Sequence, residues 1–260
     1  MCLLLIAHRA HKDYALVVAA NRDEFHERPT APARRWDEHP QLLAGRDLES
    51  GGTWLGVDSS GRFSTVTNVR SGLSVSSRQR SRGLLITDFL TGALPASQYA
   101  TSLVQNASSY QGFNILVRDR NDLYWYSNQL DSPQALSAGI YTLSNAMLDT
   151  PWAKTELLRE RYARAVSGDE PPDVASLLTI LRDAKVARDD DLPDTGVGVQ
   201  MERRLSPIFI EGTGYGTRCS TVVLIRNDGT LTFHERRYDC YANVSGEDQF
   251  SFKLSSDTCA

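Results

Sequence analysis

Residues 2–25 read CLLLIAHRAHKDYALVVAANRDEF, and this stretch decides the fold. Apolar side chains fill 2–9 and again 14–20, whereas the intervening residues His11-Lys12-Asp13 are polar. Runs rich in Leu, Ile and Val on either side of a polar turn predict two paired β-strands. Because both faces of each strand are apolar, we expect a sheet that is buried between other layers.

The rest of the chain repeats this pattern of hairpins and adds separate helical blocks. The further strands are predicted at 53–58, 62–69, 112–118, 122–127, 138–144, 219–226 and 230–237. Helical periodicity covers 82–107, broken near 92–95, and also 152–166 and 173–184, where Asp173 is the expected N-cap. Segments 26–50 and 186–216 are predicted to be rich in loops. Hairpins without strict strand–helix alternation favour an α+β fold, in which two stacked antiparallel sheets lie between helix layers. We expect a single domain over 1–260.

Composition excludes several classes of function. A formal net charge of -4 leaves no basic excess for nucleic-acid binding. No stretch reaches the roughly 18 apolar residues of a membrane helix, and the apolar start is too short for a signal peptide. We therefore expect a cytoplasmic protein in which Cys2, Cys219, Cys240 and Cys259 are reduced. The cysteines and histidines show no metal-ligand spacing, so neither a metal nor a cofactor is expected.

Cys2 is the candidate nucleophile. It is small enough for Met1 to be removed, which would leave a thiol and a free α-amine on one residue. Their reference pKa values, about 8.5 and 7.7–8.0, are both near physiological pH. The amine can take the thiol proton, directly or through a water, and later deliver it to a leaving nitrogen. The alternative is a cysteine without a chemical role that begins a strand by chance.

The polar run Asn21-Arg22-Asp23-Glu24 ends the second strand. With the turn centred near residues 11–12, Cys2 is predicted to face Asn21. In that position Arg22 could lower the pKa of the thiol or bind a substrate carboxylate, and Asp23 could orient the α-ammonium. Four polar residues at the end of a buried strand favour a site over a solvated strand end.

Three polar residues later in the chain are further candidates. Asn68 interrupts the β-branched run 65–69, and Asn145 ends the strand 138–144. An inward amide at either position could donate to a developing oxyanion, although each is also typical of a turn at a strand end. Arg218, which opens the strand before Cys219, is the third candidate.

Several motifs resemble the NRDE family, also called the Transport and Golgi organization protein 2 family. They are Met1-Cys2, Ala20-Asn21-Arg22-Asp23-Glu24-Phe25, Arg28-Pro29-Thr30, Gly51-Gly52-Thr53-Trp54-Leu55-Gly56, Thr67-Asn68-Val69-Arg70, Leu143-Ser144-Asn145 and Gly216-Thr217-Arg218-Cys219-Ser220-Thr221. The resemblance runs over nearly the whole chain. It implies the N-terminal nucleophile (Ntn) hydrolase fold, with four layers in the order α, β, β, α.

The chain is more distantly similar to the choloylglycine hydrolase and penicillin V acylase group. Carried over residue by residue, that similarity implies a catalytic set of Cys2, Arg22, Asp23, Asn68, Asn145 and Arg218. Asn21, Glu24 and Trp54 are assigned to substrate binding. That group separates its arginine and aspartate, whereas Arg22 and Asp23 are adjacent here. Since neighbours on a strand point to opposite faces, both face Cys2 only if the strand ends or bulges there, and Glu24 is the alternative to Asp23.

Two functions remain open on this evidence. The first is a cysteine amidohydrolase that cleaves a non-peptide C–N amide bond. The second is a non-catalytic protein that binds or transfers a hydrophobic small molecule, because the family resemblance implies a link to haem, acyl-CoA or lipid handling. The expected partner is therefore a small-molecule substrate or hydrophobic ligand, and the sequence does not predict an oligomeric state.

Overall fold

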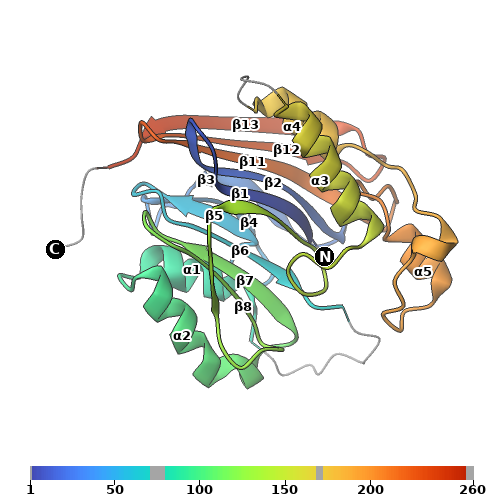
Figure 1. The fold of residues 1–260 in the computed structure, drawn as a ribbon, viewed down its shortest axis with the longest axis horizontal. Coiled ribbons are helices and arrows are strands. Elements are labelled where there is room, and N and C mark those ends of the chain that lie inside the picture. Colours follow the sequence, from blue (N-terminus) through green and yellow to red (C-terminus); the bar gives the residue numbers. More distant parts are fainter. Residues whose placement is uncertain (1, 71–79, 168–171, 256–260) are drawn as a thin grey trace.

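The computed structural model describes residues 2–70, 80–167 and 172–255. Its centre is a pair of stacked antiparallel sheets (Figure 1). The first sheet has the order β10-β1-β2-β11-β12-β13. These strands are β1 (Cys2–His11), β2 (Tyr14–Phe25), β10 (Gly139–Leu143), β11 (Tyr215–Arg226), β12 (Thr230–Tyr238) and β13 (Val244–Lys253). Both ends of the chain therefore contribute to one sheet.

The second sheet follows chain order, from β3 to β9. Its strands are β3 (Thr30–Arg35), β4 (Leu42–Asp47), β5 (Leu55–Asp58), β6 (Phe63–Asn68), β7 (Phe113–Arg118), β8 (Leu123–Ser127) and β9 (Gln134–Leu136). Each strand is antiparallel to its neighbour. Sequential hairpins thus build this sheet, whereas the first sheet needs the long-range pairing of β2 with β11.

Helices cover the outer face of each sheet (Figure 1). α1 (Gly83–Thr91) and α2 (Ala96–Asn106) pack on the second sheet, and α3 (Ala153–Ala165) and α4 (Val174–Leu181) pack on the first. α5 (Val199–Arg204) lies apart from these layers. Three apolar clusters separate the four layers, one between the sheets and one beneath each helix pair. The predicted four-layer α+β fold is confirmed.

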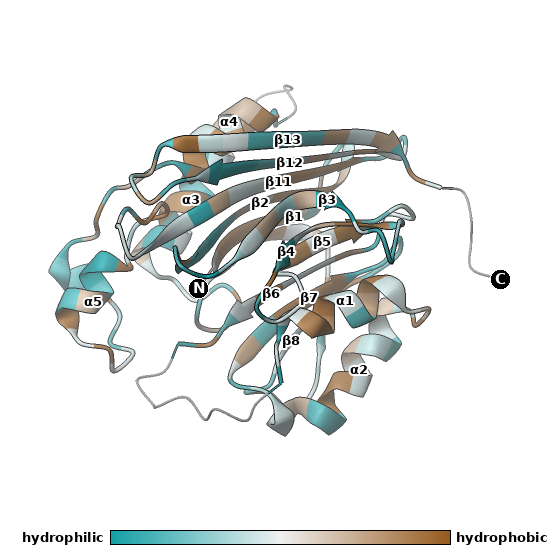
Figure 2. Ribbon diagram, turned by 180° about the vertical axis from the view of Figure 1, so that it is seen from behind, coloured by the Kyte–Doolittle hydropathy of each residue, from teal (hydrophilic) through white to brown (hydrophobic). Residues whose placement is uncertain are grey.

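Most of the predicted elements are present. Asp173 caps α4 as expected, because its side chain accepts a hydrogen bond from the Ser176 backbone N–H at 2.9 Å. The prediction of a loop-rich 26–50 was wrong, since this segment forms β3 and β4. β3 is an edge strand with mostly exposed or half-buried side chains, so it lacks the apolar run by which the other strands were recognised. β13 is likewise a polar edge strand, and Figure 2 shows hydrophilic and hydrophobic residues mixed along it.

No helix within the described ranges is long and apolar enough to cross a membrane.

Candidate functional site

The β1–β2 hairpin places Cys2 directly opposite Arg22. The predicted partner, Asn21, is one residue away and pairs instead with Leu3. The turn is centred on Lys12 and Asp13, one residue later than predicted, which alone would pair Cys2 with Asp23. An irregularity between His8 and His11, where Arg9 has a positive φ of 47°, moves the pairing to Arg22. Opposite Cα atoms in an antiparallel pair lie about 4.5–5.5 Å apart. The hairpin therefore brings the backbone of Cys2 next to a different member of the polar run than predicted.

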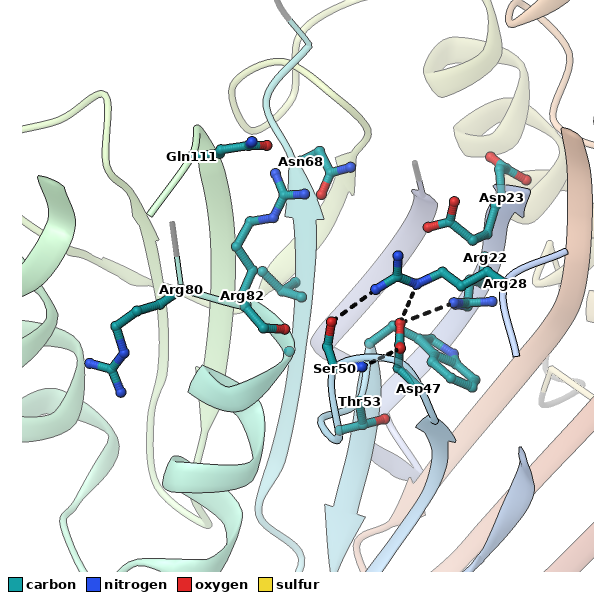
Figure 3. A pocket seen from close by; sticks show the side chains of 15 residues that line it. Arg22, Asp23, Arg28, Asp47, Ser50, Thr53, Asn68, Arg80, Arg82 and Gln111 are labelled. Carbon is teal, nitrogen blue, oxygen red and sulfur yellow. Dashed lines mark hydrogen bonds and ion pairs between the residues drawn. The ribbon is translucent and has the colours of Figure 1, made fainter. Parts of the chain in front are cut away.

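A pocket of about 230 Å³ lies beside this end of β2 (Figure 3). One side, which we call the β2 wall, is formed by Arg22, Asp23, Glu24, Arg28, Asp47 and Ser50. The opposite side, the α1 wall, is formed by Asn68, Arg80, Ser81, Arg82, Gly83 and Gln111. Thr53, Trp54 and Val66 complete the lining. Most of the lining is therefore polar, and arginines are present on both walls.

Arg22 is a buried cation on the β2 wall, with 5% of its surface exposed. Its guanidinium lies over the Trp54 ring, 4.4 Å from the centroid. Its polar contacts are long, since Nη1 donates to Thr30 Oγ1 over 3.4 Å and Nη2 lies 3.6 Å from Asp47 Oδ2. A buried charge with distant partners is costly, so this position is suited to an anion in the pocket.

Asp47 and Arg28 form the tight ion pair of the same wall. Arg28 Nε donates to Asp47 Oδ2 at 2.6 Å, and Nη2 donates to Ser50 Oγ at 3.0 Å (Figure 3). Arg28 Nη1 donates to Glu49 Oε1 at 3.0 Å. Burial alone raises the pKa of Asp47, but hydrogen bonds from Arg28 and from the Ser50 backbone, together with the charges of Arg28 and Arg22, bring this pKa below its ordinary value. Asp47 is thus an ionised anchor for both arginines.

Asp23 follows Arg22 on the strand and makes different contacts. Its Oδ1 accepts a hydrogen bond from Thr217 Oγ1 at 2.6 Å. Burial raises its pKa, against the opposing effects of Lys154, Arg70 and the Thr217 hydrogen bond. The sequence analysis expected the strand to end or bulge here, but β2 continues through both residues to Phe25. Both residues nevertheless line the pocket.

The irregularity lies in the neighbouring strand. In β11, Thr217 pairs with Asp23 and Cys219 pairs with Arg22, so Arg218 is an extra residue. Such a bulge redirects a side chain. Arg218 Nη1 donates to the backbone carbonyls of Phe25 at 2.8 Å and Arg28 at 3.1 Å. It does not line the main pocket and instead helps to enclose a second cavity of about 80 Å³, together with Arg22, Cys219 and Glu235.

Asn21 is turned away from the pocket. Its amide nitrogen donates to the carbonyls of Leu181 and Ile208, both at 2.8 Å, and its oxygen accepts from Ser220 Oγ at 2.6 Å. With 1% of its surface exposed, Asn21 joins β2 to the helix layer. Asn21, which was assigned to substrate binding, is not among the residues that line the pocket.

The structure brings the two candidate asparagines together. Asn145 Nδ2 donates to the backbone carbonyl of Asn68 at 3.0 Å, and the Asn145 carbonyl accepts from the Arg70 backbone N–H at 2.7 Å. Asn68 lines the pocket, whereas Asn145, with 1% of its surface exposed, does not. Asn145 is therefore placed to position Asn68.

Sequence reasoning assigned no role to several residues of the pocket. Arg28 and Asp47 lie in the segment that was expected to be loop-rich. Arg82 belongs to the basic cluster 78–82, and such a cluster is by itself typical of a solvated surface. The first two residues of this cluster lie outside the described ranges. Gln111 belongs to none of the sequence motifs. Only the Arg28-Pro29-Thr30 motif marked any of these residues beforehand.

In the described part of the chain, no group of three or more His, Cys, Asp or Glu side chains is arranged to hold a metal ion. Cys219 and Cys240 are not in disulfides, and Cys259 lies outside the described residues.

The chain is similar to several known proteins. The solved structures include the Caenorhabditis elegans N-acylethanolamine-hydrolyzing acid amidase ortholog, at 11% identity and a TM-score of 0.49, covering 86% of this chain and 92% of that one. A mutant of the Clostridium perfringens conjugated bile acid hydrolase has 8% identity and a TM-score of 0.42, covering 99% and 94%.

Sequence relatives are closer. The human Transport and Golgi organization protein 2 homolog is 34% identical over 239 residues, which is 86% of each chain. The Drosophila melanogaster Transport and Golgi organization protein 2 is 27% identical over 247 residues, covering 85% of this chain and 86% of that protein. The family model described as Transport and Golgi organisation 2 matches residues 1–240. The chain therefore belongs to the Transport and Golgi organisation 2 family.

Proposed function

We propose that this protein is a cysteine amidohydrolase that cleaves a non-peptide C–N amide bond, with Cys2 as the nucleophile after removal of Met1. One observation carries the proposal: the register of β1 and β2 pairs Cys2 with Arg22, the buried arginine of a polar pocket. A nearby cation lowers the pKa of a cysteine thiol and so favours the reactive thiolate. The four-layer arrangement agrees with the Ntn hydrolase fold that the sequence motifs imply.

The proposed reaction uses the α-amine of Cys2 as its base. The amine takes the thiol proton, and the sulfur forms a bond to the amide carbonyl carbon. Collapse of the tetrahedral intermediate breaks the C–N bond, and the α-ammonium returns the proton to the leaving nitrogen. Water then hydrolyses the thioester, which releases the acid and restores the thiol.

The remaining candidates take supporting roles in this scheme. Asn68, which lines the pocket, is the proposed donor to the oxyanion, and Asn145 holds the Asn68 backbone from behind. Asp23 is the proposed partner of the α-ammonium, with Thr217 fixing its carboxylate. Arg218 is a positioning residue, because its hydrogen bonds hold the turn between β2 and β3.

The alternative, a binding protein for haem, acyl-CoA or lipid, receives less support from this pocket. Sites for apolar ligands are lined mainly by hydrophobic and aromatic side chains. Here Trp54 and Val66 are the large apolar residues among the fifteen that line the cavity. The alternative stays a prediction that ligand titration can test.

Intact-mass spectrometry, combined with turnover, tests the proposal. We expect the purified protein to lack Met1 and to gain one iodoacetamide adduct at the amino-terminal peptide. Cys2→Ser and Cys2→Ala should each reduce turnover of a panel of fluorogenic amides at least about 10³-fold, as loss of a nucleophile does.

Cys240→Ser is the matched control, because it also removes a thiol that is not in a disulfide and should leave turnover unchanged. Undiminished activity in Cys2→Ala, or an active protein that retains Met1, would refute the mechanism.

A further inference from the structure

The two walls of the pocket differ in charge. The acidic residues that line it, Asp23, Glu24 and Asp47, all belong to the β2 wall. The α1 wall instead presents the Arg82 guanidinium and the side-chain amides of Asn68 and Gln111 (Figure 3). These groups supply N–H donors and positive charge. The α1 wall is therefore suited to an acceptor that carries negative charge.

Arg82 is held at the pocket by the backbone. Its Nη1 donates to the Gly112 carbonyl at 3.1 Å, a contact that orients the guanidinium. Arg80, on the same wall, turns away from the pocket in Figure 3 and lies over the Tyr110 ring at 5.4 Å. Arg82 is thus the cation of this wall that points into the pocket.

Each carboxylate of the β2 wall has a hydrogen-bond or ion-pair partner of its own, and Asp23 accepts from Thr217 Oγ1 at 2.6 Å. Asp47 pairs tightly with Arg28 at 2.6 Å, and its contact with Arg22 is the longer one, at 3.6 Å. Glu24 is directed toward its own strand, because its Oε1 accepts a hydrogen bond from the Phe25 backbone N–H at 2.9 Å. Arg22 therefore adds to the positive potential between the walls. A ligand with an acid group at one end would fit this potential.

We propose that the substrate of this site is an amide that carries an acid group, with that group bound by Arg82 and Gln111 on the α1 wall. The amide would lie toward Arg22 and Cys2. The position of the amide rests on the proposed function, whereas recognition of the acid group does not. The volume of about 230 Å³ is below the roughly 300–1,000 Å³ of pockets for drug-sized ligands, so the recognised part of the substrate is small.

Calorimetric titration of the Cys2→Ala protein tests the acid group without requiring turnover. The probes are succinamate and succinamide, which differ only by a carboxylate in place of an amide. We expect succinamate to bind about tenfold more tightly, as a charge-assisted contact predicts. The same preference should fall to about threefold or less in Arg82→Gln and be largely kept in Arg82→Lys.

Inorganic phosphate at constant ionic strength is a third probe. If it displaces succinamate and binds more tightly, the acid group is a phosphoryl group rather than a carboxylate.

Arg188→Gln is the matched control, because it removes the same charge from a side chain that is 83% exposed and outside the pocket. Equal affinity for the acid and neutral probes would overturn the proposal, as would equal effects of Arg82→Gln and Arg188→Gln. If the preference holds but wild-type protein cleaves no amide, the substrate class stands and the proposed reaction fails. If wild-type protein cleaves neutral amides as fast as acidic ones, the proposed reaction stands and the substrate class fails.

Discussion

At the scale of single residues, Asp47 has the clearest energetic role. It accepts from Arg28 and from the backbone N–H groups of Glu49 and Ser50. We expect Asp47→Asn to lower the free energy of unfolding by about 1–3 kcal/mol at pH 7, because hydrogen bonds to charged groups are lost. Urea denaturation over a range of pH values measures this difference.

The pH dependence of that effect has a definite sign. The pKa of Asp47 is lower in the folded protein than its ordinary value, so its stabilisation is complete above the unfolded pKa of about 3.9. It is lost as the pH falls through the folded pKa. The difference between wild type and Asp47→Asn should therefore shrink below about pH 4. Asp190→Asn, at a side chain that is 89% exposed, is the control. A cost that stays constant down to pH 2 would contradict this role.

Residue identities could be read from the sequence better than their partners could. Cys2 and the run 21–24 were singled out by their chemistry and by the apolar strands around them, and the structure pairs Cys2 with a member of that run. Which member of the run lies opposite Cys2 depended on a one-residue irregularity near Arg9. A shift of one residue exchanges the faces of a strand. Arg22, rather than Asn21, therefore lies opposite Cys2.

At the scale of elements, Asn21 joins β2 to the helix layer. Its amide nitrogen donates to the carbonyl of Leu181 at the end of α4 and to that of Ile208. We expect Asn21→Ala to cost about 2–4 kcal/mol, because two buried carbonyls lose their donor. Thermal and urea unfolding measure the loss. Asn121→Ala, at an exposed turn position, should change stability by less than about 0.5 kcal/mol, and a similar effect of both variants would argue against this role.

The bulge at Arg218 could not be predicted from the local sequence, although Arg218 itself was a candidate. Pairing of β11 with β2 joins residues nearly 200 positions apart, such as Asn21 and Ser220. No local pattern states which strands become neighbours, or that Thr217 and Cys219 flank an extra residue. The local hairpins of the second sheet, by contrast, carry their turn chemistry in the sequence. Short polar strands such as β3 were missed because their signal is neither apolar nor periodic.

At the scale of the whole molecule, Gly45 marks a point where the two sheets approach closely. A Cβ at this position in β4 would lie 2.3 Å from the Trp54 ring and 3.2 Å from Glu235 Oε2, which belongs to the other sheet. We expect Gly45→Ala to cost about 1–3 kcal/mol, because the inserted methyl group overpacks the core. It should also shift the tryptophan fluorescence, since the ring beneath Arg22 must move.

Gly214→Ala is the matched control for this effect, because a Cβ there meets no atom within 4 Å. An unchanged unfolding midpoint and unchanged fluorescence in Gly45→Ala would show that the sheets can separate at this point without cost.

The overall architecture was predictable because its signals are redundant. Strands that are apolar on both faces required covering layers, and the helical blocks of α1–α2 and α3–α4 supplied them. The pocket was less predictable, because its walls come from β2, the loop after β4, the end of β6 and the residues before α1 and β7. Tertiary packing alone brings those segments together.

Arg22 has one more consequence for solvent. Its side chain borders both the main pocket and the 80 Å³ cavity that contains Glu235, so one residue divides two compartments. Glu235 is buried, and its Oε2 has no hydrogen-bond partner among the described residues. Truncation at position 22 would therefore remove a side chain that lines both cavities and enlarge the space beside this carboxyl group.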